Sequence, residues 1–142
     1  MKILLKEYFR LLLENSLISK GKIFVLDSPK LVVHRTTNPD LTVTDLDPMA
    51  IRKTRQSKRG SSPMVGLYTY GIENDVPRYG ENKIELKIPA GTKVLDLRDP
   101  KLRGTSSRIS LEDAKELLSA GIKAIVGYDF VGPEEWILLE LP

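Results

Sequence analysis

Short apolar runs separated by proline, glycine and polar residues occupy most of the chain after residue 21. β-Branched, aliphatic and aromatic residues dominate these runs, a composition typical of strands. Turns are expected at 27–29 and 89–91, each of which contains a proline. The pattern predicts strands at Lys22–Leu26, Lys30–His34, Leu41–Leu46, Met64–Tyr70, Lys83–Ile88, Lys93–Leu97, Lys123–Val126 and Glu135–Leu141.

Two segments have the apolar period of a helix. Residues 1–20 are expected to form a separate N-terminal amphipathic helix, which packs on its own domain or docks a partner. Its apolar stripe consists of Leu4, Leu5, Tyr8, Leu11 and Leu12. The second helix is expected to begin after Ser110, whose hydroxyl can accept a hydrogen bond from the backbone N–H of Asp113, and to end at Gly121.

The order of these elements predicts the fold class. Strands outnumber helices and do not alternate regularly with them, which favours an α+β fold over a doubly wound parallel sheet. With 142 residues, of which 41% are hydrophobic, the chain is long enough to bury one core. We therefore expect one domain over 21–142, preceded by the N-terminal helix.

The amino-acid composition limits the kinds of reactive and metal-binding sites that the chain can form. The absence of cysteine excludes disulfides, thiolate metal sites and a cysteine nucleophile. His34 is the only histidine, so it must carry any histidine-dependent step. No run approaches the length of about 18 apolar residues that a membrane span requires, and charges interrupt the apolar N-terminus as they would not in a secretory signal. A cytoplasmic location without membrane contact is expected.

Charge is unevenly distributed along the chain. The net charge is +3, yet the first 63 residues hold 12 of the 22 basic and 6 of the 19 acidic side chains. Five cations lie within 52–59, inside the long polar segment 48–63. Such a run is either a solvated surface loop or a site for phosphate.

Three segments place a polar side chain at the edge of an apolar strand. The first ends in His34-Arg35-Thr36, and the second is Gly66-Leu67-Tyr68, with Tyr79 eleven residues after Tyr68. The third is Glu135 followed by Trp136-Ile137-Leu138. Each segment by itself is also compatible with ordinary strand packing, and Glu134 is expected to be a solvated loop acid.

Together, in this order, the three segments resemble the H-Y-E type of ADP-ribosyltransferase, the group of the poly(ADP-ribose) polymerase and diphtheria-toxin-like catalytic domains. The resemblance covers about residues 31–140. It implies a split, mostly antiparallel sheet with flanking helices. It also implies transfer of ADP-ribose from NAD to a macromolecular acceptor, protein or nucleic acid, with release of nicotinamide. Transfer of a single ADP-ribose is expected, because the chain has little room for a polymer-binding element.

The resemblance further implies a role for each matched residue. Glu135 would stabilise the positive charge that develops on the reacting ribose, and Tyr68 and Tyr79 would stack on nicotinamide. His34 would donate a hydrogen bond to the adenosine-side ribose while staying neutral. Thr36 would bond the same ribose, and the backbone of Gly66 would help to line the site.

Arg35, Val76 and Pro133 depart from the family pattern. Arg35 replaces a glycine, and its guanidinium could pair with the NAD pyrophosphate. Val76 replaces a serine that bonds the nicotinamide amide, and Pro133 disfavours arginine as the acceptor. Arg35 and Val76 keep open a non-catalytic module of the same fold that binds NAD or a partner. An enzyme that removes 2′-phosphates from RNA with NAD is a third possibility.

Overall fold

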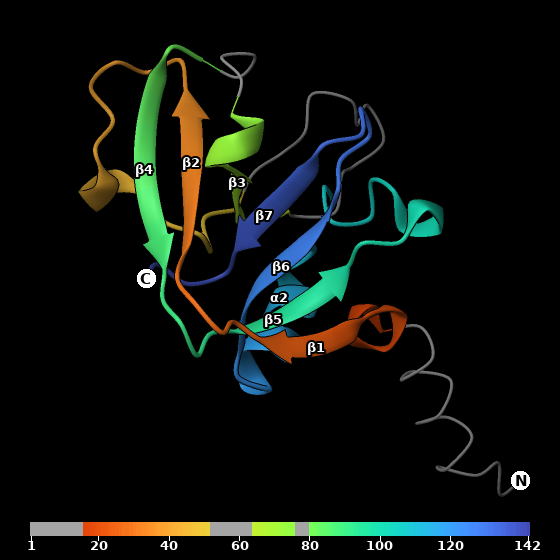
Figure 1. Ribbon diagram of the computed structural model, residues 1–142. Helices are drawn as coiled ribbons and strands as arrows, with labels where there is room; N and C mark the ends of the chain where they lie inside the picture. The colour runs from red at the N-terminus through yellow and green to blue at the C-terminus, as the bar shows by residue number, and fades with distance from the viewer. Residues whose placement is uncertain (1–15, 52–63, 76–79) are drawn as a thin grey trace, which may run out of the picture.

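The computed structural model describes residues 16–51, 64–75 and 80–142, arranged around a strongly twisted sheet (Figure 1). Mostly β structure and one α-helix among the described residues agree with the predicted α+β class. The strands are β1 (Lys22–Val25), β2 (Lys30–Thr36), β3 (Leu67–Gly71), β4 (Asn82–Ile88), β5 (Lys93–Leu97), β6 (Ile122–Tyr128) and β7 (Glu134–Leu138). The α-helix is α2 (Leu111–Ser119), and the 3₁₀ turns are η1 (Leu17–Lys20), η2 (Val43–Asp45), η3 (Ile72–Asn74) and η5 (Pro100–Leu102).

The strand order in the sheet is β1-β5-β6-β7-β3-β2-β4. Only β5 and β6 run parallel, because the segment between them contains α2 and brings the chain back to the same end of the sheet. The sequence-adjacent strands β1 and β2 lie in different halves of the sheet, as do β4 and β5. The two turns that cross between the halves are bonded to each other, from Leu26 N–H to Thr92 O (3.0 Å) and from Gly91 N–H to Leu26 O (2.8 Å).

Backbone hydrogen bonding joins all seven strands into one sheet, whereas the sequence resemblance implied a split sheet. The junction between β2 and β3 is the shortest ladder, with Val32 opposite Gly71 and Val33 opposite Tyr70. β2 pairs along its whole length with β4 instead. The specific family fold remains a prediction.

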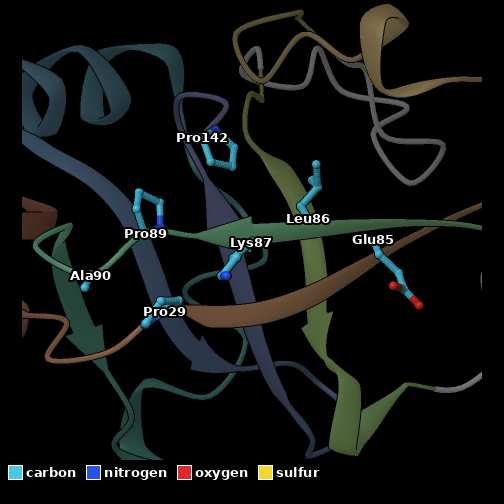
Figure 2. Close-up of a pocket in the computed structure, with 7 residues that line it drawn as sticks. All are labelled: Pro29, Glu85, Leu86, Lys87, Pro89, Ala90 and Pro142. Atoms are coloured by element: carbon cyan, nitrogen blue, oxygen red, sulfur yellow. The ribbon is translucent and has the colours of Figure 1, made fainter.

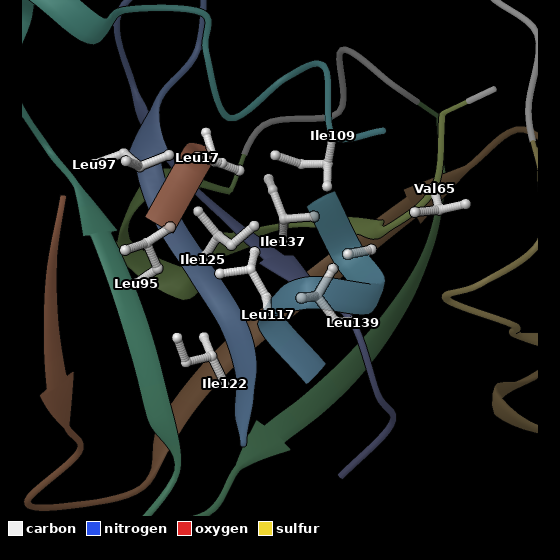
Figure 3. Packing of buried hydrophobic residues seen from close by; sticks show 11 residues of the cluster. Leu17, Val65, Leu95, Leu97, Ile109, Leu117, Ile122, Ile125, Ile137 and Leu139 are labelled. Atoms are coloured by element: carbon white, nitrogen blue, oxygen red, sulfur yellow. The ribbon is translucent and has the colours of Figure 1, made fainter. Parts of the chain in front are cut away.

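A separate hydrophobic core covers each face of the sheet. Helix α2 contributes Ala114 and Leu117 to the first core, where they pack on Ile125 and Ile137 of the central strands (Figure 3). Ser110 caps the helix as predicted, because its hydroxyl accepts a hydrogen bond from the N–H of Asp113 (3.1 Å). The second core includes Val32, Leu46, Leu86, Val126, Trp136 and Leu138.

The segments 41–46 and 1–20 differ from the other elements in how the structure bears on their predictions. The strand predicted at Leu41–Leu46 is wrong, because this segment contains the 3₁₀ turn η2. Thr42 and Asp45 bond each other's backbone there, and such local bonds compete with strand pairing. Most of the predicted N-terminal helix, residues 1–15, lies outside the described residues. Its described end is the turn η1, whose Leu17 is buried in the first core.

A shallow surface hollow of about 400 Å³ lies where the end of β4 meets the C-terminus (Figure 2). Pro29, Leu86, Pro89, Ala90 and Pro142 line it together with Glu85 and Lys87. The Glu85 carboxylate points away from the prolines in Figure 2. None of these residues belongs to the predicted site.

Candidate active site around Glu135

Glu135 is held at the centre of the sheet. It is the second residue of β7, opposite Gly127 of β6 and Tyr70 of β3. The apolar residues that follow it are buried and fix β7 between its two neighbours. Glu135 itself is only 2% exposed, so its carboxylate is a buried polar group that requires partners.

Two serines of the segment between β5 and α2 supply these partners. The hydroxyls of Ser106 and Ser107 both donate to Oε1 of Glu135, at 2.8 Å and 2.6 Å. Within the described part of the chain, Oε2 has no hydrogen-bond partner. Burial raises the pKa of Glu135, and the nearby charge of Asp129 raises it further, while the bonds from Ser107 and Ser106 lower it.

Tyr68 lies on the neighbouring strand β3 and shares a face of the sheet with Glu135. It packs against the first core, as does Ile137, the residue opposite it on β7. Its phenol donates a hydrogen bond to the backbone carbonyl of Ser107 (2.8 Å). Ser107 therefore contacts Tyr68 through its carbonyl and Glu135 through its hydroxyl.

His34 is half-buried on β2, the strand next to β3. Its Nδ1 lies 2.8 Å from the backbone carbonyl of Tyr68. A carbonyl oxygen only accepts hydrogen bonds, so Nδ1 carries the proton in this contact. In the neutral ring Nε2 is then an acceptor, whereas the sequence predicted a neutral histidine that donates to ribose.

Arg35 has a protein partner in place of the predicted pyrophosphate. Its Nε and Nη2 donate to the two carboxylate oxygens of Asp75, at 2.8 Å and 2.6 Å, and Nη1 donates to the carbonyl of Glu81 (3.2 Å). This forked ion pair lowers the pKa of Asp75. Contact with NAD would require Arg35 to leave Asp75, so its role in NAD binding stays a prediction.

Thr36 and Gly66, two further predicted binding residues, take part in local contacts. Thr36 Oγ1 accepts a bond from the N–H of Asn38 (3.1 Å). Gly66 adopts a φ of 107°, and a Cβ there would lie 2.5 Å from Cγ2 of Ile137, so glycine is required. Tyr79, Val76 and the cationic run 52–59 lie outside the described residues, and the predictions made for them stand as predictions.

Glu134 is not the solvated loop acid that the sequence predicted. It is the half-buried first residue of β7, on the opposite face of the sheet from Glu135. Its Oε1 accepts a bond from the indole Nε1 of Trp136 (3.0 Å), and its Oε2 lies 3.5 Å from Nη1 of Arg98. Position 134 belongs to the strand, so the alternation of side chains along β7 directs Glu134 to the face opposite Glu135. The bond from Trp136 then holds its carboxylate in place.

Sequence reasoning missed Ser106, Ser107 and the buried pair Tyr70–Asp129. The phenol of Tyr70 donates to Oδ2 of Asp129 (2.8 Å). Oδ1 accepts from the backbone N–H of Val131 and Gly132, both at 2.8 Å. Asp129 thus anchors the turn that leads into Glu135. No periodic pattern marks these residues; the nearest signal is the polar composition of the segment 102–108.

Comparisons of the chain with protein-family models, with curated proteins and with solved structures give no match. No helix in the described ranges is long and apolar enough to cross a membrane. The same ranges contain no group of three or more histidine, cysteine, aspartate or glutamate side chains that could hold a metal ion.

Proposed function

We propose that this protein is a mono-ADP-ribosyltransferase, which moves ADP-ribose from NAD to a macromolecular acceptor and releases nicotinamide. One observation carries the proposal. His34, Tyr68 and Glu135 lie on β2, β3 and β7, which are neighbours in the sheet, and separate hydrogen bonds link His34 to the Tyr68 carbonyl, the Tyr68 phenol to the Ser107 carbonyl, and the Ser107 hydroxyl to Glu135. Residues that are 101 positions apart in the sequence are thus brought onto three neighbouring strands of the sheet.

Glu135 suits the charge requirement of this reaction. Cleavage of the nicotinamide–ribose bond passes through an oxocarbenium-like sugar, as in glycoside hydrolysis. Nicotinamide leaves with the bonding electron pair, the acceptor's nucleophilic atom bonds to the ribose carbon, and the acceptor loses a proton. An ionised carboxylate in a site of low dielectric stabilises the positive sugar strongly. Its Oε2, which receives no hydrogen bond from the residues that the structure describes, can accept one from the ribose 2′-hydroxyl.

The remaining residues would bind and orient NAD. Tyr68, held by Ser107 next to Glu135, would stack on the nicotinamide ring together with Tyr79. With its Nδ1 proton committed to the Tyr68 carbonyl, a neutral His34 would accept a hydrogen bond from an adenosine-side ribose hydroxyl. Thr36 and the backbone of Gly66 would contribute at the edge of the site.

A non-catalytic module that binds NAD or a partner is the second candidate. The forked pairing of Arg35 with Asp75 favours it, because the side chain that replaces the family's glycine is engaged in the protein's own structure. Binding without turnover would then be the function of the same cluster.

The Glu135→Gln substitution tests the catalytic role. Glutamine keeps the volume and an acceptor oxygen but removes the charge that balances the reacting sugar. Loss of one preorganised electrostatic group costs about 10²–10³ in rate, so nicotinamide release under single-turnover conditions should fall by that factor. NAD affinity should change much less, because the ground state carries little of the developing charge.

Glu134→Gln is the matched control. It removes a carboxylate from the adjacent position of the same strand, on the opposite face of the sheet, and glutamine can still accept the bond from Trp136. Its rate of nicotinamide release should stay close to wild type. Equal rates for Glu135→Gln and wild type would refute the catalytic assignment, whereas NAD binding without turnover in all three proteins would favour the binding module.

A further inference from the structure

We propose that Ser106 and Ser107 are positioning residues for Glu135, which hold one carboxylate oxygen so that the other faces the reacting ribose. This inference rests on the proposed function and assigns work to a segment outside the three family motifs. Neither serine needs to touch NAD for this role.

The distribution of hydrogen bonds over the carboxylate supports the inference. Both serine hydroxyls donate to Oε1, and within the described residues Oε2 receives none. Two donors on one oxygen fix the side-chain torsion and leave the second oxygen as an acceptor for a hydroxyl of the substrate. Because each hydroxyl has one proton, both bonds favour the ionised carboxylate.

The sheet is shaped to admit Ser106. Ser106 is 1% exposed and lies over Gly127, the residue of β6 opposite Glu135. A Cβ at Gly127 would lie 2.5 Å from Oγ of Ser106, so any larger residue there would displace the hydroxyl. A glycine inside a buried strand costs stability, and the room that Gly127 leaves for Ser106 to reach Glu135 explains its presence near the end of β6.

The segment that carries the serines is fastened at its start. The N–H of Gly104 donates to the carbonyl of Tyr128 (2.8 Å). With a φ of 81°, Gly104 also lets the ring of Phe130 approach so closely that a Cβ would lie 2.3 Å from it. The serines are therefore held in place from β6 and from the turn that leads to Glu135, and a preorganised hydroxyl loses little entropy on binding its partner.

Ser107 also contacts both Tyr68 and Glu135. Its carbonyl accepts the phenol of Tyr68 while its hydroxyl binds Glu135. The position of the stacking tyrosine and that of the carboxylate are thus set by the same residue. Replacing the hydroxyl alone leaves the carbonyl in place, so the effect on Glu135 can be separated from the effect on Tyr68.

Serine-to-alanine variants test this role. Ser106→Ala, Ser107→Ala and the double variant are compared with wild type for nicotinamide release from NAD in single-turnover experiments from acid to alkaline pH. Each single variant should slow release about 10-fold, as expected for loss of one bond to a charged group, with NAD affinity nearly unchanged. The rise of activity on the acid side should move to higher pH, because the lost bonds had lowered the pKa of Glu135.

Two further variants separate positioning from general damage. Ser107→Thr retains the hydroxyl and should recover most of the rate. Thr105→Ala removes a hydroxyl of the same segment that forms no hydrogen bond with any residue in 16–51, 64–75 or 80–142, and should leave both the rate and the pH profile unchanged. A Ser107→Ala rate equal to or above that of wild type, or an unmoved acid limb, would overturn the inference.

A measurement without turnover keeps the two proposals apart. If the wild type binds NAD but releases no nicotinamide, the proposed function fails. The role of the serine contacts is then tested by carbon NMR of the protein, with its glutamates labelled at the side-chain carboxyl carbon. The Glu135 signal should titrate at higher pH in the double variant than in wild type, and identical titrations would overturn the positioning role.

Discussion

Glu135 shows at the scale of a single residue how a buried carboxylate is held in a folded protein. Its burial opposes ionisation, and the two serine bonds favour it. An acid whose pKa is raised by folding destabilises the native state once the pH exceeds its ordinary range. The carboxylate therefore costs stability at neutral pH, a cost that a purely structural residue at this position would not impose.

The pH dependence of stability should reveal this cost. Below the ordinary pKa of glutamate, both folded and unfolded chains are protonated at position 135, and the penalty is absent. As the pH rises, the unfolded chain ionises first, and the penalty grows until the folded pKa is passed. The free energy of unfolding of Glu135→Gln, relative to wild type, should therefore increase as the pH rises above the ordinary pKa of glutamate, 4.5. Urea unfolding of both proteins checks this, and parallel pH curves would contradict it.

At the scale of elements, the candidate site depends on two connections, the turn after β6 and the segment after β5. The turn after β6 is anchored by Asp129, which bonds two backbone N–H groups and the phenol of Tyr70. The segment after β5 packs against this turn and carries Ser106 and Ser107. The strands supply rigidity, and these two connections decide where the donors for Glu135 lie.

Asp129→Ala should loosen the turn before Glu135. It removes three hydrogen bonds to a buried charged group and should lower the free energy of unfolding by about 3 kcal/mol. Tyr70→Phe removes only one of the three and should cost about 1 kcal/mol. Chemical denaturation of the two variants measures the ratio; equal losses would show that the backbone bonds of the turn contribute little.

At the scale of the whole molecule, the two halves of the sheet are connected by crossing segments, and the N-terminal end of the described chain closes one core. Leu17 of η1 is 6% exposed and packs in the core beneath α2. Leu17 therefore belongs to the folded unit.

Removal of residues 1–15 should preserve NAD cleavage, because they lie outside the region of resemblance, about residues 31–140. A chain that begins at Ser16 keeps Leu17 and should release nicotinamide at close to the full-length rate, with a modest loss of stability if the predicted helix caps the core. Leu17→Ala in the full chain should cost about 2–4 kcal/mol, because it opens a cavity in the core. Loss of turnover in a truncated chain that circular dichroism shows to be folded would contradict this prediction.

The sequence by itself determined the element types and the positions of the motif residues. Seven of its eight predicted strands and the helix after Ser110 follow from apolar period and turn residues, because these signals are local. The exception, at Leu41–Leu46, has Thr42 and Asp45 bonding their own backbone. The three motif segments were likewise visible, because each ends or begins an apolar strand.

Tertiary structure alone decided which side chains meet. The adjacency of β2, β3 and β7 comes from long-range pairing, which no local pattern encodes. Ser106 and Ser107 lie in a segment without an apolar period, and the contact of Ser106 with Glu135 depends on Gly127, which is 21 residues further along the chain. Tertiary structure also placed Asp75 beside Arg35 and Trp136 beside Glu134. A charged side chain near a buried surface needs a compensating polar group, and the fold decides which one lies within reach.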